Sequence, residues 1–168
     1  MSAYKAQLLI DLTASQTTEG YYLMAFNYTE DDGTTVATPN FANEDTLTFE
    51  LYCKTNGATN AFDSDFQIQF EPADTSNPPS ITSPLTGYTS NASHDIESQT
   101  DLNNVTSPST VPSSFSIGGQ DYYLYASKQF SLTGPTSGLD EHRSTYQVTV
   151  DGKLFKKDPE MDIGPHIV

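Results

Sequence analysis

The chain has 168 residues and a net charge of −15, from 22 acidic and 7 basic residues, with a single cysteine. This length suits one domain, and the negative charge disfavours binding to nucleic acid or to anionic membranes. One cysteine excludes an intramolecular disulfide, no apolar run predicts a membrane span, and no segment resembles a secretory signal peptide, so we expect a cytoplasmic protein.

The first two predicted strands differ in how many of their faces are apolar. Residues 4–12 place Leu8, Ile10 and Leu12 on one face of a strand. Residues 20–28 are apolar on both faces, which is typical of a central or covered strand. If this strand lies at the edge of a sheet, it can instead pair with another chain.

The next two predicted strands show a regular period of two. Residues 46–54 alternate apolar with polar side chains and place Cys53 on the apolar face. We therefore expect Cys53 to be a buried and unreactive thiol. Residues 65–71 repeat the pattern, with Gln67 and Gln69 on the polar face.

The middle third of the chain has a different composition. Residues 72–114 are rich in Pro, Ser, Thr and Asn and poor in apolar residues. This composition predicts long surface loops with short strands around residues 85–89 and 113–117. Loops of such length in a compact domain are usually functional or disordered.

Residues 121–132 form the longest predicted strand. Regular alternation places Tyr122 and Phe130 together on its apolar face, with Tyr123 and Tyr125 on its polar face. An exposed tyrosine can stack on a sugar ring and offer its hydroxyl group. The alternative interpretation is cross-strand packing on the surface of a sheet.

The clearest hairpin covers residues 145–157. Asp151 and Gly152 supply a two-residue turn between two alternating segments, and this dipeptide favours a type I′ turn. A two-residue turn at this position sets Val148 opposite Phe155.

These patterns predict one all-β domain over residues 1–168. No helical segment separates the strands, so we expect them to pair antiparallel in two sheets, as a β-sandwich of the jelly-roll or immunoglobulin type. The loop-rich segment 72–114 belongs to this domain. A β-barrel is the alternative closure.

The sequence contains no motif of a known catalytic site. It has no Gly-x-Ser-x-Gly segment, and its three histidines, His94, His142 and His166, lack the spacing of a metal-binding helix. We therefore expect the protein not to be an enzyme.

Acidic residues gather in three places where they could bind calcium. Calcium takes roughly six to eight oxygen ligands, which carboxylates and backbone carbonyls of loops supply. The candidate ligands are Asp31 and Asp32; Asp63 and Asp65; and Asp158, Glu160 and Asp162. The third group is the first choice, and ordinary acidic turns are the alternative interpretation.

A candidate ligand site combines polar loop residues with exposed aromatic rings. We select Asn91, Asn103 and Asn104 of the loop region together with Tyr123 and Tyr125. Acidic loops, outward tyrosines and abundant Asn and Ser side chains form a composition that lectins use. The interpretation is calcium-assisted binding of a glycan or a small polar ligand, with no organic cofactor.

Two terminal segments resemble the AidA/PixA family of bacterial inclusion-body proteins. Residues 7–13 resemble the opening strand with its Ile-Asp step, and residues 146–153, with Phe155 and Asp158-Pro159, resemble the closing hairpin. The resemblance implies a small bacterial β-sandwich without known catalysis that accumulates inside cells. The chain departs from the family pattern by lacking tryptophan and by having only three methionines.

Three functions therefore compete. The first is a lectin-like binding protein, found in the cytoplasm, released from the cell or held in inclusions. The second is a structural or storage protein that self-assembles into intracellular inclusions. The third is an acidic decoy that mimics nucleic acid and binds a basic partner.

Overall fold

The computed structural model describes residues 1–11, 15–37, 39–53, 64–88, 94–95, 114–117, 119–150, 153–157 and 160–165. These residues form strands and turns and contain no helix, which confirms the all-β prediction. Among them, accordingly, no helix is long and apolar enough to cross a bilayer.

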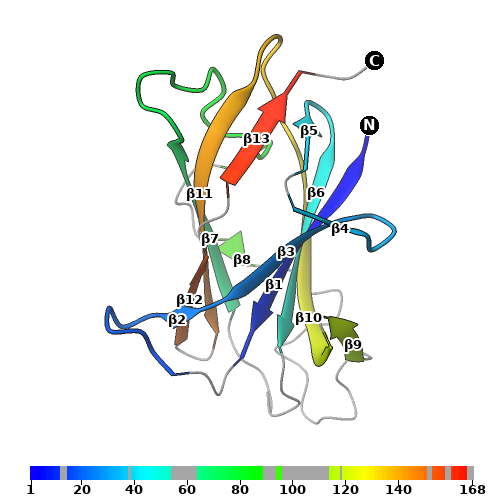
Figure 1. The fold of residues 1–168 in the computed structure, drawn as a ribbon, viewed down its shortest axis with the longest axis vertical. Helices are drawn as coiled ribbons and strands as arrows, with labels where there is room; N and C mark the ends of the chain where they lie inside the picture. Colours follow the sequence, from blue (N-terminus) through cyan, green and yellow to red (C-terminus); the bar gives the residue numbers. More distant parts are fainter. Residues whose placement is uncertain are drawn as a thin grey trace.

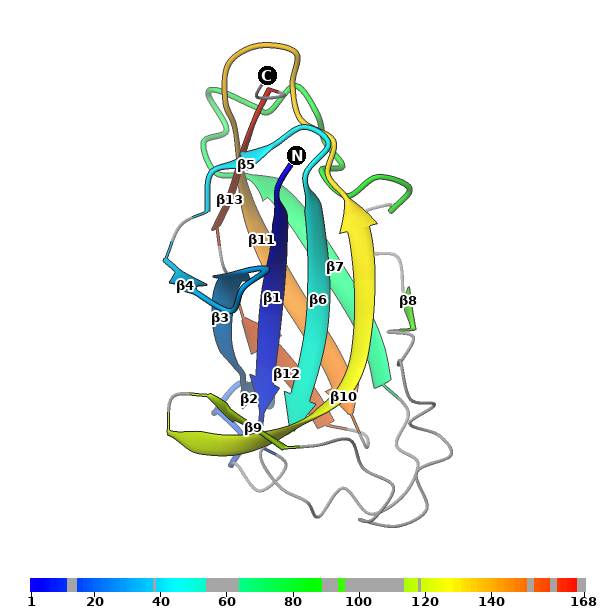
Figure 2. The ribbon, with the colours of Figure 1, turned by 90° about the vertical axis from the view of Figure 1, so that its right-hand side faces the viewer.

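The strands form two sheets that face each other, with β11 and β13 on one side in Figure 1 and β1, β6 and β10 on the other. Sheet A runs, in spatial order, through β4 (Thr35–Val36), β3 (Ala25–Glu30), β1 (Ala3–Ile10), β6 (Thr46–Cys53), β10 (Gln120–Ser131) and β9 (Ser114–Ile117). Sheet B runs through β2 (Tyr22–Leu23), β12 (Lys153–Lys157), β11 (Asp140–Val150), β13 (Glu160–Gly164) and β5 (Phe41–Ala42), and also contains β7 (Ser64–Pro72) and β8 (His94–Asp95). Figure 2 shows sheet A in front of sheet B.

The prediction that all strands pair antiparallel is wrong for three pairs. Strand β1 pairs parallel with β6, β2 with β12, and β5 with β13. A parallel pair needs a long crossover between its strands, and a helix usually supplies it. Here the chain between β1 and β6 passes through β2, β3, β4 and β5, so strands of both sheets supply the crossover.

The core lies between the two sheets and follows the predicted alternation. Leu8, Ile10 and Cys53 are fully buried, as their positions in the sequence predicted. Burial raises the pKa of the Cys53 thiol, which keeps it protonated and unreactive. A hydrogen bond of 2.9 Å joins the hydroxyl groups of Tyr28 and Tyr146 inside this core and links sheet A to sheet B. Burial raises the pKa of Tyr146 to about 12.

The predicted strand 20–28 is divided between the two sheets. Its first part, β2, pairs in sheet B, and its second part, β3, pairs in sheet A. Met24 lies at the crossing point, is 2% exposed, and donates its backbone N–H to the carbonyl oxygen of Lys156 at 3.3 Å. The apolar character of both faces therefore comes from a segment that changes sheets.

Strand β10 departs from regular alternation. Its register against β6 shifts after Leu124, and Figure 2 shows the start of the strand curving across the lower end of the sheet. Tyr122 consequently packs with Leu9 and Tyr52 in a small cluster on the outside of sheet A, whereas Phe130 lies in the main core. The prediction that Tyr122 and Phe130 share a face is wrong, because an inserted residue reverses the alternation.

The closing hairpin has the predicted register. Val148 lies opposite Phe155, and Thr149 lies opposite Leu154. The turn residues Asp151 and Gly152 lie outside the described residues.

The described part of the loop-rich segment closes the open side of the sandwich. Residues 114–117 form a strand as predicted, whereas residues 85–88 contribute only one bridge, between Leu85 and Leu132. The Tyr88 hydroxyl group accepts the backbone N–H of Ile68 at 2.7 Å and donates to its carbonyl oxygen at 3.3 Å. These bonds satisfy the backbone groups of Ile68 on the edge of β7 that does not face β11.

Candidate functional site

A groove of about 440 Å³ lies on the outer face of sheet B. We call it the sheet B groove. Its lining residues are Tyr21, Leu23, Gln69, Thr145, Gln147, Lys156 and Lys157.

Strand alternation places the polar lining residues on the outer face. Tyr146 is fully buried in β11, so its neighbours Thr145 and Gln147 point out of the sandwich. In β12 the same rule applies, because Phe155 is fully buried and Lys156 points outward. The apolar core thus determines which side chains reach the groove.

Strand pairing then aligns side chains from four strands in one row. Gln67 of β7 lies opposite Gln147, which lies opposite Lys156, and Lys156 lies opposite Leu23 of β2. Directly opposed residues of neighbouring strands have Cβ atoms about 5 Å apart. The row therefore crosses the sheet as a continuous strip of amide, ammonium and apolar groups.

Two lysines of β12 lie over aromatic rings at the edge of the sheet. The Lys156 ammonium group is 5.2 Å from the centre of the Tyr21 ring, and that of Lys153 is 5.7 Å from the Tyr22 ring. Both distances are within the range of cation–π attraction. With Lys157, the five residues of β12 hold three of the seven basic residues of the chain.

The lining residues of the sheet B groove offer groups that bind polar ligands. They include an aromatic ring, amides, a hydroxyl group and ammonium groups, whereas Ser, Cys, His and carboxylate side chains are absent from this described lining. The groove is therefore suited to binding a polar ligand.

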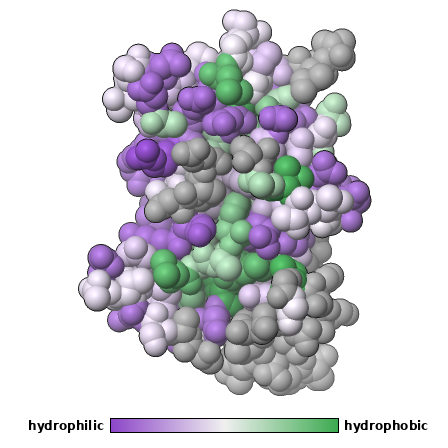
Figure 3. Space-filling view, in the orientation of Figure 1, coloured by the Kyte–Doolittle hydropathy of each residue, from purple (hydrophilic) through white to green (hydrophobic). Residues whose placement is uncertain are grey.

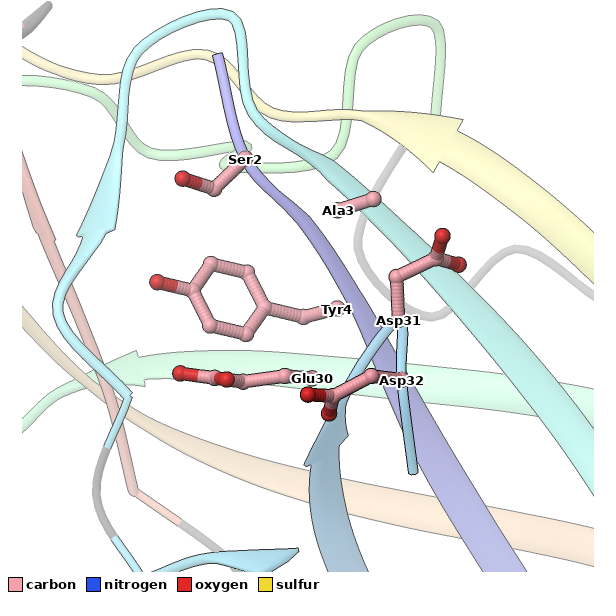
Figure 4. A pocket seen from close by; sticks show the side chains of 6 residues that line it. All are labelled: Ser2, Ala3, Tyr4, Glu30, Asp31 and Asp32. Atoms are coloured by element: carbon pink, nitrogen blue, oxygen red, sulfur yellow. The ribbon is translucent and has the colours of Figure 1, made fainter. Parts of the chain in front are cut away.

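A second concave site, the acidic hollow, has a volume of about 360 Å³. Figure 4 shows its lining residues, which are Ser2, Ala3, Tyr4, Glu30, Asp31 and Asp32. The Asp31 carboxylate points away from those of Glu30 and Asp32 (Figure 4), and Asp32 accepts the backbone N–H of Thr34 at 2.9 Å. Hydrogen bonding to Thr34 lowers the pKa of Asp32. The first predicted calcium group thus forms an ordinary turn, in which the carboxylates do not converge.

The other two predicted calcium groups are described only in part. Asp63 and Asp158 lie outside the described residues. Asp65 lies in β7, where the strand 65–71 was predicted, whereas Glu160 and Asp162 lie in β13, where a loop was predicted. Across the parts of the chain that the structure describes, no three His, Cys, Asp or Glu residues are grouped to hold a metal ion.

The predicted ligand residues do not meet at the sheet B groove in the described structure. Asn91, Asn103 and Asn104 lie outside the described residues. Tyr123 and Tyr125 belong to β10 of sheet A, where the backbone of Tyr123 lies opposite Cys53 and Tyr125 falls at the register shift. Their role in ligand binding stays a prediction.

Tyr21, Gln147 and Lys156 were not among the predicted site residues. The hairpin register already set Gln147 opposite Lys156, so this part of the row could have been found. The contribution of Tyr21 depends on the change of sheet after β2, and that of Gln69 depends on a long-range pairing of β7 with β11. No local sequence pattern indicates either of these.

Two other carboxylates are buried and hold backbone groups. Asp45 accepts the N–H groups of Ser2 at 2.7 Å and Ala42 at 2.9 Å. Asp140 accepts the N–H groups of Ser80 at 2.9 Å and Ile81 at 2.8 Å. Part of the negative charge therefore fixes loops to the sandwich.

His142 is the one histidine whose side chain the structure describes. It is 1% exposed, and its Nε2 atom has no hydrogen-bond partner among the described residues. Burial lowers its pKa, and the nearby Asp140 carboxylate partly opposes this shift. Its ring contacts Phe70 edge to face, with 5.9 Å between ring centres, so His142 is a neutral core residue.

No family model matches the chain, and no curated protein sequence matches it. The resemblance to the AidA/PixA proteins stays a prediction. The function is therefore argued from the chemistry of the sheet B groove.

Proposed function

We propose that this chain is a non-enzymatic, lectin-like protein that binds a sugar or a similar polar ligand in the sheet B groove. The observation that carries the proposal is that Tyr21, Gln69 and Gln147 line one concave surface, where Gln69 also donates from its amide to the Glu71 carboxylate at 2.8 Å. A sugar ring has an apolar face that packs on an aromatic ring, and its hydroxyl groups exchange hydrogen bonds with amides.

The placement of the polar groups favours binding at low entropic cost. Thr145 and Gln147 lie on β11, which is paired on both sides, with β7 on one and with β12 and β13 on the other. Side chains on a paired strand are already ordered, so less conformational freedom is lost when the ligand binds. Only Tyr21 and Leu23 come from the end of the sheet.

We do not propose a calcium ion in this groove, because its described lining contains no carboxylate to bind it. We propose calcium as an ion of the acidic groups outside the groove, where it would stabilise the protein. Glycan binding and calcium binding are therefore tested in two separate experiments.

Replacement of Tyr21 by alanine tests the proposal. We expect wild-type protein to bind members of a panel of neutral and acidic polysaccharides in affinity electrophoresis. Tyr21→Ala should weaken that binding about three- to tenfold, because it removes an aromatic contact worth roughly 0.5–1.5 kcal/mol. Leu139→Ala is the matched control, since Leu139 is exposed and lies outside the lining of the groove.

Two results would contradict the proposal. One is that wild-type protein binds no polysaccharide or oligosaccharide in the panel. The other is that Tyr21→Ala and Leu139→Ala have equal effects on the affinity. Unchanged thermal unfolding of both variants would establish that the affinities compare folded proteins.

The second candidate function is self-assembly as a structural or storage protein. Strand β2 ends sheet B and carries Leu23, whose side chain is 67% exposed. Figure 3 shows hydrophobic surface in the lower part of this view, where β2 leads into β3. An unpaired edge strand with an exposed apolar side chain favours pairing with another chain.

A further inference from the structure

We propose, on the basis of the proposed sugar-binding function, that the bound sugar carries an anionic group. The structure assigns this group, a carboxylate or a sulfate, to the ammonium group of Lys156. The ligand class is therefore an acidic polysaccharide or oligosaccharide.

The sign of the charge in the groove is the first support. Acidic residues outnumber basic ones by 22 to 7 in the chain, yet the described lining holds two lysines and no acidic residue. A protein of net charge −15 repels anions over most of its surface. A concave site of opposite sign is the place where such a protein can hold an anion.

The second support is that the two lysines lack carboxylate partners. Among the residues that the structure describes, neither Lys156 nor Lys157 forms an ion pair. Surface lysines of acidic proteins have many carboxylates to pair with. The Lys156 ammonium group, which lies over the Tyr21 ring of the groove, is therefore available to bind an anion from solution.

The third support is the distance between charge and ring. The Lys156 ammonium group lies 5.2 Å from the centre of the Tyr21 ring. An anion bound by Lys156 is therefore close to this ring, and one acidic sugar unit is long enough to contact both. The amide of Gln147, opposite Lys156 in the neighbouring strand, is placed to bond with a hydroxyl group of the same unit.

A matched pair of polymers tests the charge. Polygalacturonate and its fully methyl-esterified form share one backbone and differ in the carboxylate. We expect full-length protein to bind polygalacturonate at least about tenfold more tightly than the ester, because a charged hydrogen bond contributes roughly 1.5–3 kcal/mol. This preference should fall as sodium chloride is raised. Dextran sulfate and dextran form the second pair and distinguish sulfate from carboxylate.

A matched pair of variants locates the binding group. Lys156→Gln should lower the affinity for the preferred anionic polymer about tenfold more than it lowers the affinity for the neutral form. Lys5→Gln is the control, because it makes the same change of net charge on β1 of sheet A. We expect its affinities to stay within about twofold of wild type.

The outcomes separate this inference from the function on which it rests. Equal affinity for the anionic and neutral forms of both polymers would overturn the inference and leave the sugar-binding function standing. Equal losses in Lys156→Gln and Lys5→Gln would also overturn it, since net charge would then explain the preference. Absence of binding to every polymer would overturn the proposed function itself.

Discussion

The hydroxyl group of Tyr88 forms hydrogen bonds with backbone groups of β7 that a neighbouring strand would usually bind. Ile68 lies opposite Tyr146 of β11, and its own N–H and carbonyl groups point to the other side of β7. Both bond to Tyr88, whose ring also packs edge to face against Phe130, with 5.8 Å between ring centres. The Tyr88 side chain therefore bonds to the backbone of β7 at the edge of sheet B and contacts Phe130 of β10 in sheet A.

We predict that Tyr88→Phe lowers the free energy of unfolding by about 1–3 kcal/mol. The ring stays, but the buried N–H and carbonyl groups of Ile68 lose their partner. Urea denaturation followed by circular dichroism measures the change. Tyr21→Phe is the control, since it removes a hydroxyl group at the surface and should cost less than about 0.5 kcal/mol. Equal effects of the two variants would contradict this account of the β7 edge.

For the strands, local sequence patterns predicted faces and hairpin register correctly, but they did not predict the pairing of strands distant in sequence. The alternation around Cys53 and the Val148–Phe155 register were predicted correctly, because each depends on neighbours in sequence. The change of sheet at Met24 and the shift after Leu124 were missed. Both depend on which distant strand offers a partner, and a period of two contains no information on that choice.

The candidate site was missed for the same reason. Its residues are outward polar positions of β7, β11 and β12, together with the end of β2. The alternation indicated that Gln69 faces outward, but it did not indicate which strand lies beside it. The predicted exposed tyrosines belong to β10, whereas the aromatic residue of the groove, Tyr21, precedes a two-residue strand.

The exposed edge of β2 gives a prediction on assembly. If the second candidate function holds, wild-type protein forms oligomers as its concentration rises, and Leu23→Lys shifts it toward monomer. A charged side chain at an edge opposes pairing with another chain. Light scattering across a concentration series measures the mass, with Leu139→Lys as the control for added charge. A wild-type protein that stays monomeric at the highest concentration would rule out assembly through β2.

At the scale of the whole molecule, the acidic residues serve different purposes. Asp45 and Asp140 hold backbone N–H groups, and Asp32 closes a turn. Three of the seven basic residues lie in β12, next to the end strand β2 of sheet B. The net charge of the chain therefore does not predict the lysines of the sheet B groove, because strand pairing brings its lining residues together.

We predict that calcium raises the melting temperature by roughly 5–10 °C over EDTA if an acidic group binds it at a hundredfold excess over Kd. Such binding stabilises the native state by about 2.7 kcal/mol. Differential scanning fluorimetry measures the shift, with magnesium as the ionic control. Asp162→Asn should reduce the shift and Asp31→Asn should not, if the first-choice group holds the ion. Identical melting temperatures in calcium and EDTA would contradict the proposal that calcium stabilises the protein.

Sheet B combines strands from the first half of the sequence with strands near its end, and this affects folding during synthesis. Strands β1, β3 and β6 can pair once residue 53 has been synthesised, but β2 and β5 find their partners, and β7 its longer partner β11, only in residues 140–164. Roughly a hundred residues separate the two events, which is on the order of ten seconds of synthesis. During that time the apolar inner face of sheet A has no opposite sheet to cover it. A nascent chain of this topology therefore passes through its most aggregation-prone state on the ribosome, before β12 and β13 exist.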